Sequence, residues 1–480
     1  MAIALVAIAG CSFAPTYDTP KTDVADAYKE LGPWHAAAPS DQLERGEWWR
    51  DFHDPTLDDL EAKIDLANPD LAVALARYEQ ASAYLAQTQG NALPEIDAGG
   101  LATRNRQSDH RPLRSAAQPS EFGDHLLALS LGYELDLWGR VRNLVAAGKA
   151  NTQAACADLA SVRLTLHAQL ADDYIALRSL DAEEKLLVDT AAAYAQALKL
   201  TQNRFEGGIA SGLDVARAQN QLDNARAQTT DIRARRALRE HAIASLIGKS
   251  ASRFSLPANV VDLSPPSVPI ALPSTLLERR PDIAAAERRV AAANAMIGVA
   301  RAAFFPSISL TATGGYENAG GSHWLTAPNG FWSIGPRFSL ALFDAGKRHA
   351  IDAQAKAVFN EAADRYRATT LTAFREVEDN LALLHLLGEE AKQEKAAVES
   401  AQHALYLATD RYENGAVNYL DVVASQTAAL QAQRTSLELR QRQLTASVDL
   451  IRALGGGWAV ADLADRNNAA NSPKAIAEPR

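Results

Sequence analysis

The sequence predicts a mixed α and β fold in which pairs of long strands alternate with very long helices, in an order that occurs twice. Three observations predict this fold class. Similar blocks of residues recur at a constant offset along the chain, and two segments alternate apolar and polar residues with period two, each beside a second segment that alternates less cleanly. The helical stretches are also far longer than those of an ordinary compact domain.

Composition narrows the class of protein further. Of the 480 residues, 47% are hydrophobic and 22% are charged, which is normal for a folded protein and excludes wholesale disorder. The formal net charge of -10 leaves no basic surface for nucleic acid, so none is expected as a partner. No segment reaches the eighteen uninterrupted apolar residues of a transmembrane helix, so a membrane role would depend on strands or on a lipid anchor.

The chain opens with a short apolar run that has the length of a signal-peptide core. Ile8–Gly10 resembles a bacterial lipobox, which predicts cleavage and acylation at Cys11. The alternative is an ordinary apolar N-terminus with a chance Gly-Cys pair. Because no Lys or Arg precedes the core, we expect the signal peptide to start upstream of Met1. We assign residues 1–10 to the signal peptide and 11–55 to a lipid-anchored segment.

An internal repeat organises the rest of the sequence. Arg204–Gly208 reads Arg-Phe-Glu-Gly-Gly, and Arg411–Gly415 reads Arg-Tyr-Glu-Asn-Gly. The same offset relates Asp214 to Asp421. A series of matches in constant register predicts that the chain is internally duplicated.

A proline-rich segment separates the two copies. Five prolines between Phe254 and Pro273 forbid a continuous helix there and predict an extended linker. We therefore predict a first structural repeat over residues 56–252, a linker over 253–273, a second repeat over 274–456 and a flexible tail over 457–480.

Each repeat is expected to open with one helix and to end with a long helical hairpin. The expected ranges are Thr56–Ala92, Arg140–Asn203 and Gly212–Ile247 in the first repeat, and Ser274–Ala303, Arg348–Asp410 and Tyr419–Leu454 in the second. At ~1.5 Å per residue, the first long helix would span on the order of 95 Å. An apolar stripe with helical spacing runs along it from Leu159 to Leu177.

Two strand-like segments lie between the helices of each repeat. Leu127–Leu137 and Phe305–Tyr316 alternate apolar and polar residues, which indicates a sheet that is wetted on one face only. They reach the ~9–11 residues that a tilted strand needs to cross a membrane. Their partners are expected near Glu95–Thr103 and Pro336–Phe343, and the polar loops Asn105–Glu121 and Asn318–Gly330 would lie outside the cell. A soluble sandwich strand is the alternative interpretation.

Four strands per chain cannot close a barrel. An open edge in lipid leaves backbone groups unpaired, at a cost of several kcal/mol each, and bacterial outer-membrane barrels start at about eight strands. Assembly from several copies follows, and three copies would supply about twelve strands. A plain coiled-coil scaffold would explain the helices but not the strand pairs.

Several motifs resemble those of TolC-like outer membrane factors of the NodT and OprM type, which are efflux lipoproteins. These motifs are Trp48–Leu57, Tyr133–Arg142, Glu278–Ile283, Phe304–Ile308 and Leu342–Arg348. The resemblance implies a homotrimer, with a twelve-stranded outer-membrane β-barrel that is continued by a periplasmic α-helical barrel. It also implies docking to a periplasmic adaptor protein and to an inner-membrane pump of the resistance–nodulation–division class.

The resemblance also implies a gate at the periplasmic tip of the tunnel, where inner helices bring acidic side chains together. The matching segment here is Tyr412–Val422, which contains the gate candidates Tyr412, Tyr419 and Asp421. Asp421 matches the first of two gate aspartates in the best-known member of the family. The second falls on Ala424, so this chain lacks a two-layer acidic ring.

Further gate features are less well matched. A gate arginine of the same family member falls on Val417, which puts the same closing salt bridges in doubt. Asp214 is the first-repeat counterpart of Asp421. The alternative for both aspartates is helix capping or a first-turn charge, worth ~0.3–1 kcal/mol, and we favour it for Asp214.

No catalytic activity is expected. The sequence contains no His-Glu-x-x-His, no Gly-x-Ser-x-Gly and no paired cysteine motif, so neither a metal site nor a cofactor is predicted. Single histidines such as His167 are more simply packing or surface residues. The expected function is a passive outer-membrane exit duct for drugs or other small toxic compounds. The alternatives are a duct for type I protein secretion and, in another class, a soluble periplasmic coiled-coil adaptor.

Overall fold

The computed structural model describes residues 12–22, 24–30, 47–112, 115, 117–266, 277–319 and 324–458. The predicted signal peptide, Cys11 and almost all of the predicted tail lie outside these residues. The chain divides into two compact units. We call them the sheet unit, which comprises Met1–Lys21, Arg77–Ala155 and Ala285–Arg367, and the hairpin unit, which comprises Thr22–Ala76, Cys156–Ala284 and Ala368–Arg480.

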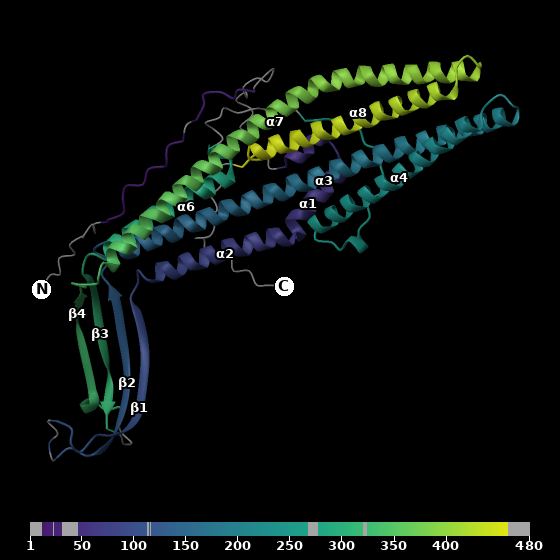
Figure 1. Cartoon of the computed structure of the whole chain (residues 1–480). Coiled ribbons are helices and arrows are strands. Elements are labelled where there is room, and N and C mark those ends of the chain that lie inside the picture. The colour runs from purple at the N-terminus through teal and green to yellow at the C-terminus, as the bar shows by residue number, and fades with distance from the viewer. Residues whose placement is uncertain are drawn as a thin grey trace. The chain divides into compact units, whose positions relative to one another are not determined.

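The sheet unit contains one antiparallel sheet with the strand order β1-β2-β3-β4 (Figure 1). The strands are β1 (Glu95–Arg106), β2 (Glu121–Glu134), β3 (Ser307–Asn318) and β4 (Gly330–Ser339). The sequence predicted all four strands but misplaced two of them. Compared with the expected ranges, β2 begins six residues earlier and ends three residues earlier, and β4 begins six residues earlier and ends four residues earlier. Pairing of Arg106 with Glu121 and of Tyr316 with Gly330 extends the ladder beyond the alternating segments. Backbone hydrogen bonds, and not side-chain alternation, therefore set the strand ends.

The register gives the sheet one apolar and one polar face. One cross-strand row contains Ile96, Leu131, Ala312 and Ile334, and the next row on the same face contains Ala98, Leu129, Gly314 and Trp332. A row on the opposite face contains Asp97, Ser130, Thr313 and Ser333. On the apolar face Trp332 is 80% exposed and Phe338 is 79% exposed. So much exposed apolar surface on one side of a sheet marks a face that another apolar phase covers.

The helix expected over Thr56–Ala92 is in fact two helices, α1 (Pro55–Ala67) and α2 (Pro69–Gly90). Asn68 between them is extended, with φ -71° and ψ 123°, because a residue before proline is disfavoured in the α conformation. Its side chain donates to the carbonyl of Leu246 at 2.7 Å and accepts the Leu71 N–H at 2.9 Å. The helix expected over Ser274–Ala303 is interrupted in the same way: residues 277–279 are helical, Arg280 is not, and α6 (Pro281–Ala302) begins at a proline.

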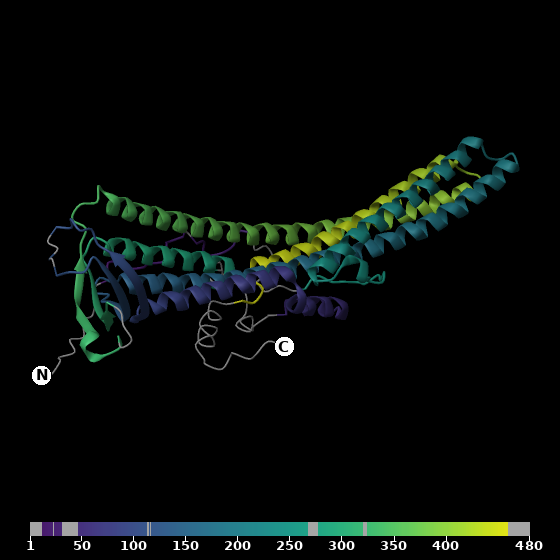
Figure 2. The same ribbon diagram turned by 90° about the horizontal axis from the view of Figure 1, so that it is seen from below.

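Two long helical hairpins end the two halves of the chain (Figures 1 and 2). They are formed by α3 (Arg140–Glu206) with α4 (Gly212–Leu246), and by α7 (Lys347–Glu413) with α8 (Tyr419–Ala453). The helices α3 and α7 both have 67 residues, and α4 and α8 both have 35. Each long helix measures roughly 100 Å at 1.5 Å per residue. Among the described residues, no helix has both the length and the apolar character required to cross a bilayer.

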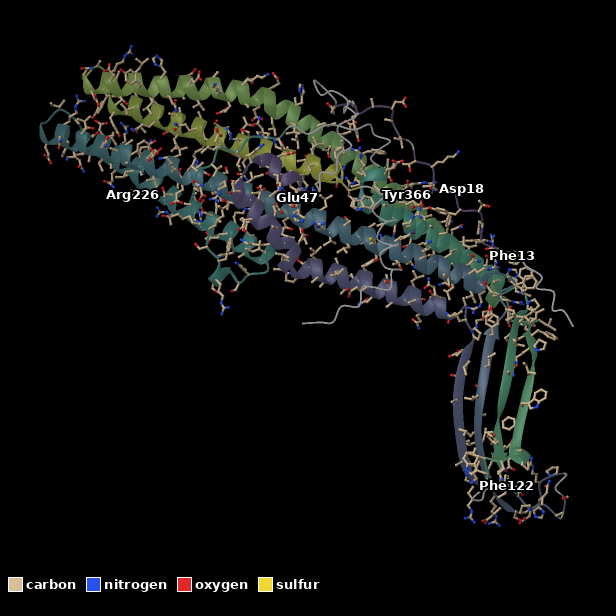
Figure 3. All side chains as sticks on the ribbon, turned by 180° about the vertical axis from the view of Figure 1, so that it is seen from behind. Phe13, Asp18, Glu47, Phe122, Arg226 and Tyr366 are labelled. Carbon is tan, nitrogen blue, oxygen red and sulfur yellow. The ribbon has the colours of Figure 1, made fainter. Side chains whose placement is uncertain are left out.

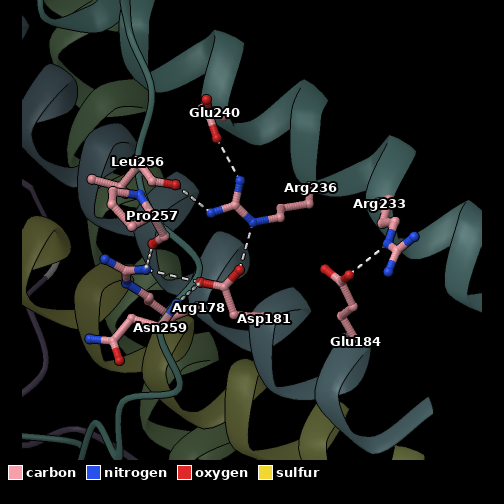
Figure 4. A network of polar contacts seen from close by, with 9 residues as sticks. All are labelled: Arg178, Asp181, Glu184, Arg233, Arg236, Glu240, Leu256, Pro257 and Asn259. Carbon is pink, nitrogen blue, oxygen red and sulfur yellow. Dashed lines mark hydrogen bonds and ion pairs between the residues drawn. The ribbon is translucent and has the colours of Figure 1, made fainter. Parts of the chain in front are cut away.

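Within the hairpin unit, a buried polar network holds the described part of the linker against α3 and α4 (Figure 4). The Asp181 carboxylate accepts from Arg178 at 2.9 Å and from Arg236 at 2.6 Å. It also accepts the backbone N–H of Asn259 at 3.0 Å. The two arginines in turn donate to the carbonyls of Pro257 and Leu256, at 3.0 and 2.6 Å. Residues 254–266, the described part of the linker after Arg253, form neither helix nor strand, so these side chains satisfy some of its backbone groups.

Candidate functional site at the hairpin tips

The two hairpin tips have the same backbone turn. After α3, Gly208 adopts φ 71° and donates to the carbonyl of Phe205 at 3.0 Å, and after α7, Gly415 adopts φ 76° and donates to the carbonyl of Tyr412 at 3.0 Å. A glycine in the left-handed conformation is the usual way to end a helix, since it carries no Cβ. The repeated Gly in the sequence therefore marks the point where each hairpin reverses.

Both candidate gate tyrosines lie in the apolar core that joins the two hairpins. Tyr412 is 6% exposed and Tyr419 is 2% exposed, and their ring centroids are 5.2 Å apart. They pack in one cluster with Tyr194 of α3 and Leu222 of α4. Burial raises the pKa of Tyr419 to about 12, so its hydroxyl stays neutral. These rings act first as packing residues, and they connect residues of both halves of the chain.

Arg204, which the sequence analysis did not select, holds the end of α7. Its guanidinium donates to the carbonyls of Tyr412 at 2.6 Å and Glu413 at 2.7 Å, and it lies 4.6 Å from the centroid of the Tyr412 ring. The Tyr412 hydroxyl lies 3.5 Å from Thr201 Oγ1. A cation at the C-terminus of a helix is stabilised by the last carbonyls. Arg204 and Arg411 occupy matching positions in the repeated sequence blocks, which could have marked Arg204 as a candidate. Only the fold shows which groups Arg204 contacts.

Asp214 caps its own helix. Its carboxylate accepts from the Ser211 N–H at 3.2 Å and from the Ser211 hydroxyl at 2.8 Å, while Ser211 Oγ accepts the Asp214 N–H at 3.2 Å. Ser211 and Asp214 thus form a capping box at the start of α4. Asp214 also lies 3.5 Å from Arg217. Its carboxylate therefore makes its contacts within the first turn of α4.

Asp421 differs from Asp214 although it occupies the matching position. The start of α8 is capped by Asn418, whose Oδ1 accepts the backbone N–H groups of Leu420 at 2.9 Å and Asp421 at 3.4 Å. The Asp421 side chain is exposed and makes no hydrogen bond or ion pair with any residue that the structure describes. Its charge is thus available at the hairpin tip.

A second feature concerns the N-terminal segment of the sheet unit, directly after Cys11. The Phe13 ring stacks on Phe305 with centroids 4.3 Å apart, and Arg301 donates to the Phe13 carbonyl at 3.2 Å. Asn294 of α6 donates to the carbonyl of Pro15 at 2.8 Å. Figure 3 shows Phe13 and Phe122 at opposite ends of the sheet. The segment is therefore held at the end of the sheet where the helices begin.

His167 is a packing residue in the hairpin unit. Its ring is 3% exposed, stacks on Trp49 with centroids 4.4 Å apart and lies 2.6 Å from the Glu61 carboxylate. Burial lowers the pKa of His167 to about 4 and raises the pKa of Glu61 well above its usual range, so burial disfavours the charged form of both side chains. The described residues contain no cluster of side chains that could hold a metal ion.

Comparisons with known proteins agree with this architecture. A family model described as outer membrane efflux protein matches residues 63–249 and 272–456. The chain is 34% identical over 467 residues to the toluene efflux pump outer membrane protein TtgF of Pseudomonas putida, which covers 95% of this chain and 96% of that protein. It is 33% identical over 466 residues to the outer membrane protein OprJ of Pseudomonas aeruginosa, with 94% of each chain covered.

A solved structure shows the same fold. The MtrE outer membrane channel of Neisseria gonorrhoeae, crystallised in its open state, matches with a TM-score of 0.82 at 26% identity. The match covers 93% of this chain and 98% of that one. The sheet with one apolar face and the two long hairpins are thus the elements of a TolC-like outer-membrane channel. The chain belongs to the outer membrane efflux protein family.

Proposed function

We propose that this chain is the outer-membrane duct of a tripartite efflux system, through which an inner-membrane pump expels small toxic compounds by way of a periplasmic adaptor. The observation that carries the proposal is the union of two structures in one chain. One is a four-stranded sheet whose central rows have one apolar face, and the other is a pair of helical hairpins whose long helices each measure roughly 100 Å. The pump supplies the energy, so the duct itself needs no catalytic residue.

The exposed sheet edges support a trimer. The described sheet has the order β1-β2-β3-β4, so one edge of β1 and one edge of β4 carry unpaired backbone groups. In lipid each unpaired group costs several kcal/mol, and pairing β1 of one copy with β4 of the next removes that cost. Three copies give about twelve strands, within the range of bacterial barrels. The apolar face then meets lipid and the polar face lines the lumen.

The structure also supports an internal duplication of the duct. Corresponding helices have equal lengths, 67 residues for α3 and α7 and 35 for α4 and α8. We assign residues 56–252 and 274–456 to the two repeats and 253–273 to the linker between them. Duplication converts three chains into six similar hairpins, which is what a helical tunnel below a threefold barrel needs.

A lipid on Cys11 fits the position of the residues that follow it. Phe13 and Pro15 are held at the end of the sheet where α6 finishes, which is the inner edge of the membrane in a barrel of this design. An acyl group on Cys11 would enter the inner leaflet of the outer membrane there. The anchor supports targeting, whereas the barrel holds the protein in the membrane.

We expect the protein, extracted from outer membranes in mild detergent, to have the mass of three chains, each with acyl groups. Native mass spectrometry measures both quantities in one experiment. The Cys11→Ser variant should remain trimeric and lose only the acyl mass. A stable monomer would contradict the trimer, and an unchanged acyl mass in Cys11→Ser would contradict the anchor.

Loss of the duct should sensitise cells to small apolar toxic compounds, the class that the name of TtgF indicates for that protein. The measurement is the growth-inhibiting concentration of solvents and amphiphilic antibiotics in a deletion strain and after complementation. We expect a severalfold drop that complementation restores. A deletion that blocks secretion of a protein and leaves these concentrations unchanged would favour the type I secretion duct instead.

A further inference from the structure

The tip of the second hairpin carries an arginine whose side chain has no partner in the described part of its own chain. Arg411 lies in the last turn of α7, is exposed, and makes no side-chain hydrogen bond or ion pair across the described ranges. Its first-repeat counterpart, Arg204, uses its guanidinium fully, on the carbonyls of Tyr412 and Glu413. Within the described part of one chain, Arg204 therefore has hydrogen-bond acceptors and the matching Arg411 has none.

The two carbonyls that accept from Arg204 have counterparts at the first tip, the carbonyls of Phe205 and Glu206. The Tyr412 carbonyl accepts the Gly415 N–H and also Arg204. The Phe205 carbonyl accepts the Gly208 N–H at the same 3.0 Å, and within the described part of the chain neither it nor the Glu206 carbonyl receives a side-chain donor. Because the two turns share their backbone hydrogen bonds, the carbonyls of the first tip have the geometry that Arg204 recognises at the second.

The side chains around these positions change in a correlated way between the repeats. Tyr412 and Thr201 bring two hydroxyls to within 3.5 Å of each other. Their counterparts are Phe205 and Ala408, so both hydroxyls are absent together. Replacing both partners of a polar contact by apolar groups is close to neutral, whereas replacing one leaves a buried group unsatisfied. Phe205 is 51% exposed in the single chain, so a surface that would contact Ala408 is open.

We propose that Arg411 of one copy clamps the first hairpin tip of the neighbouring copy, by donating to the carbonyls of Phe205 and Glu206 and stacking over the Phe205 ring. The proposal rests on the trimeric, duplicated duct proposed above. In a ring of six hairpins, each second hairpin lies between the first hairpin of its own chain and that of the next. Arg204 closes the contact within a chain, and Arg411 closes the equivalent contact between chains. Arg411 is thus a positioning residue for the closed tip.

Cross-linking tests this contact directly. In a Cys156→Ser background, Phe205→Cys combined with Ala408→Cys should give linked dimers and trimers when outer membranes are treated with a short bis-maleimide. The matched control, Thr201→Cys with Tyr412→Cys, should link within one chain, so the denatured protein should stay monomeric and gain the mass of one linker. If the first pair gives only monomers after denaturation while the native mass shows a trimer, the clamp is overturned and the duct proposal is not affected. A sample that is not trimeric overturns both.

Conductance tests the role of the side chain. Arg411→Gln should raise the mean single-channel conductance in planar bilayers as much as Arg204→Gln does, because each removes one clamp per chain. Arg411→Lys should raise the conductance less than Arg411→Gln does. The ammonium group can still donate to a carbonyl, but it lacks the planar fork that reaches two carbonyls. Arg375→Gln, on the exposed part of α7 with only a 3.9 Å ion pair to Asp379, is the control and should change nothing. A conductance that rises in Arg204→Gln and stays unchanged in Arg411→Gln overturns the proposal.

Discussion

Asp181→Ala is expected to lower the free energy of unfolding by about 3–5 kcal/mol, because it leaves the buried guanidinium of Arg178 without a carboxylate partner. The Asp181 side chain is 1% exposed, that of Arg178 is 4% exposed and that of Arg236 is 14% exposed. Removal of the carboxylate also leaves the Asn259 N–H without its acceptor, so the described part of the linker should detach from α3 and α4 (Figure 4). The measurement is the shift in the denaturant midpoint of the detergent-solubilised protein.

Glu184→Ala is the matched control for Asp181→Ala. Glu184 lies one helical turn further along α3 and forms a 2.6 Å ion pair with Arg233, whose side chain is 62% exposed. Exposed ion pairs contribute about 0–1 kcal/mol, so this variant should unfold close to the wild type. Equal midpoints for Asp181→Ala and Glu184→Ala would show that the buried network does not hold the linker.

Asp421→Ala should markedly reduce the cation selectivity of the duct in planar bilayers. Three copies of an unpaired carboxylate around the axis would form a ring that attracts cations, with limited screening in a narrow throat because the Debye length is ~8 Å. Block by multivalent cations should weaken as well. Ala424 supplies no second acidic layer, so we expect the block of the wild type to be weaker than that of a double ring. The measurements are reversal potentials and block in single-channel recordings.

The structure makes this experiment easier to interpret, because Asn418 caps α8 in place of Asp421. Asp421→Asn and Asp421→Ala should therefore both leave the helix start intact and shift selectivity together. Asp214→Asn is the control. It should weaken a capping box, by about 0.5–2 kcal/mol, and leave selectivity unchanged. Unaltered selectivity in both Asp421 variants, with trimers intact, would remove Asp421 from the gate.

Local patterns in the sequence were sufficient to predict most of the fold. Period-two alternation identified the strand pairs, and the long helical stretches located both hairpins to within a few residues, for example Gly212–Leu246 for an expected Gly212–Ile247. The errors fall where a local pattern competes with a backbone constraint. Asn68 breaks a helix whose apolar spacing continues across it, because the following proline disfavours the α conformation. The ends of β2 and β4 depend on pairing with neighbouring strands, which no single segment encodes.

The candidate site shows the limit of sequence reasoning most clearly. Tyr412 and Tyr419 could be selected from the sequence, but not their burial in a core shared by both hairpins. Asp214 and Asp421 match in register and look alike in sequence. The fold distinguishes them, because Ser211 donates to the carboxylate of Asp214, whereas Asn418 caps α8 and the carboxylate of Asp421 has no partner among the residues that the structure describes.

The sequence by itself determined the kinds of element and their order, since periodicity, proline and glycine act over a few neighbouring residues. Only the tertiary structure decided which of two equivalent side chains finds a partner. Arg204 meets the carbonyls at the end of α7, 208 and 209 positions away, while Arg411 meets none in the described chain. Contacts over such separations depend on how whole helices pack, and a pattern confined to one helix carries no information about them.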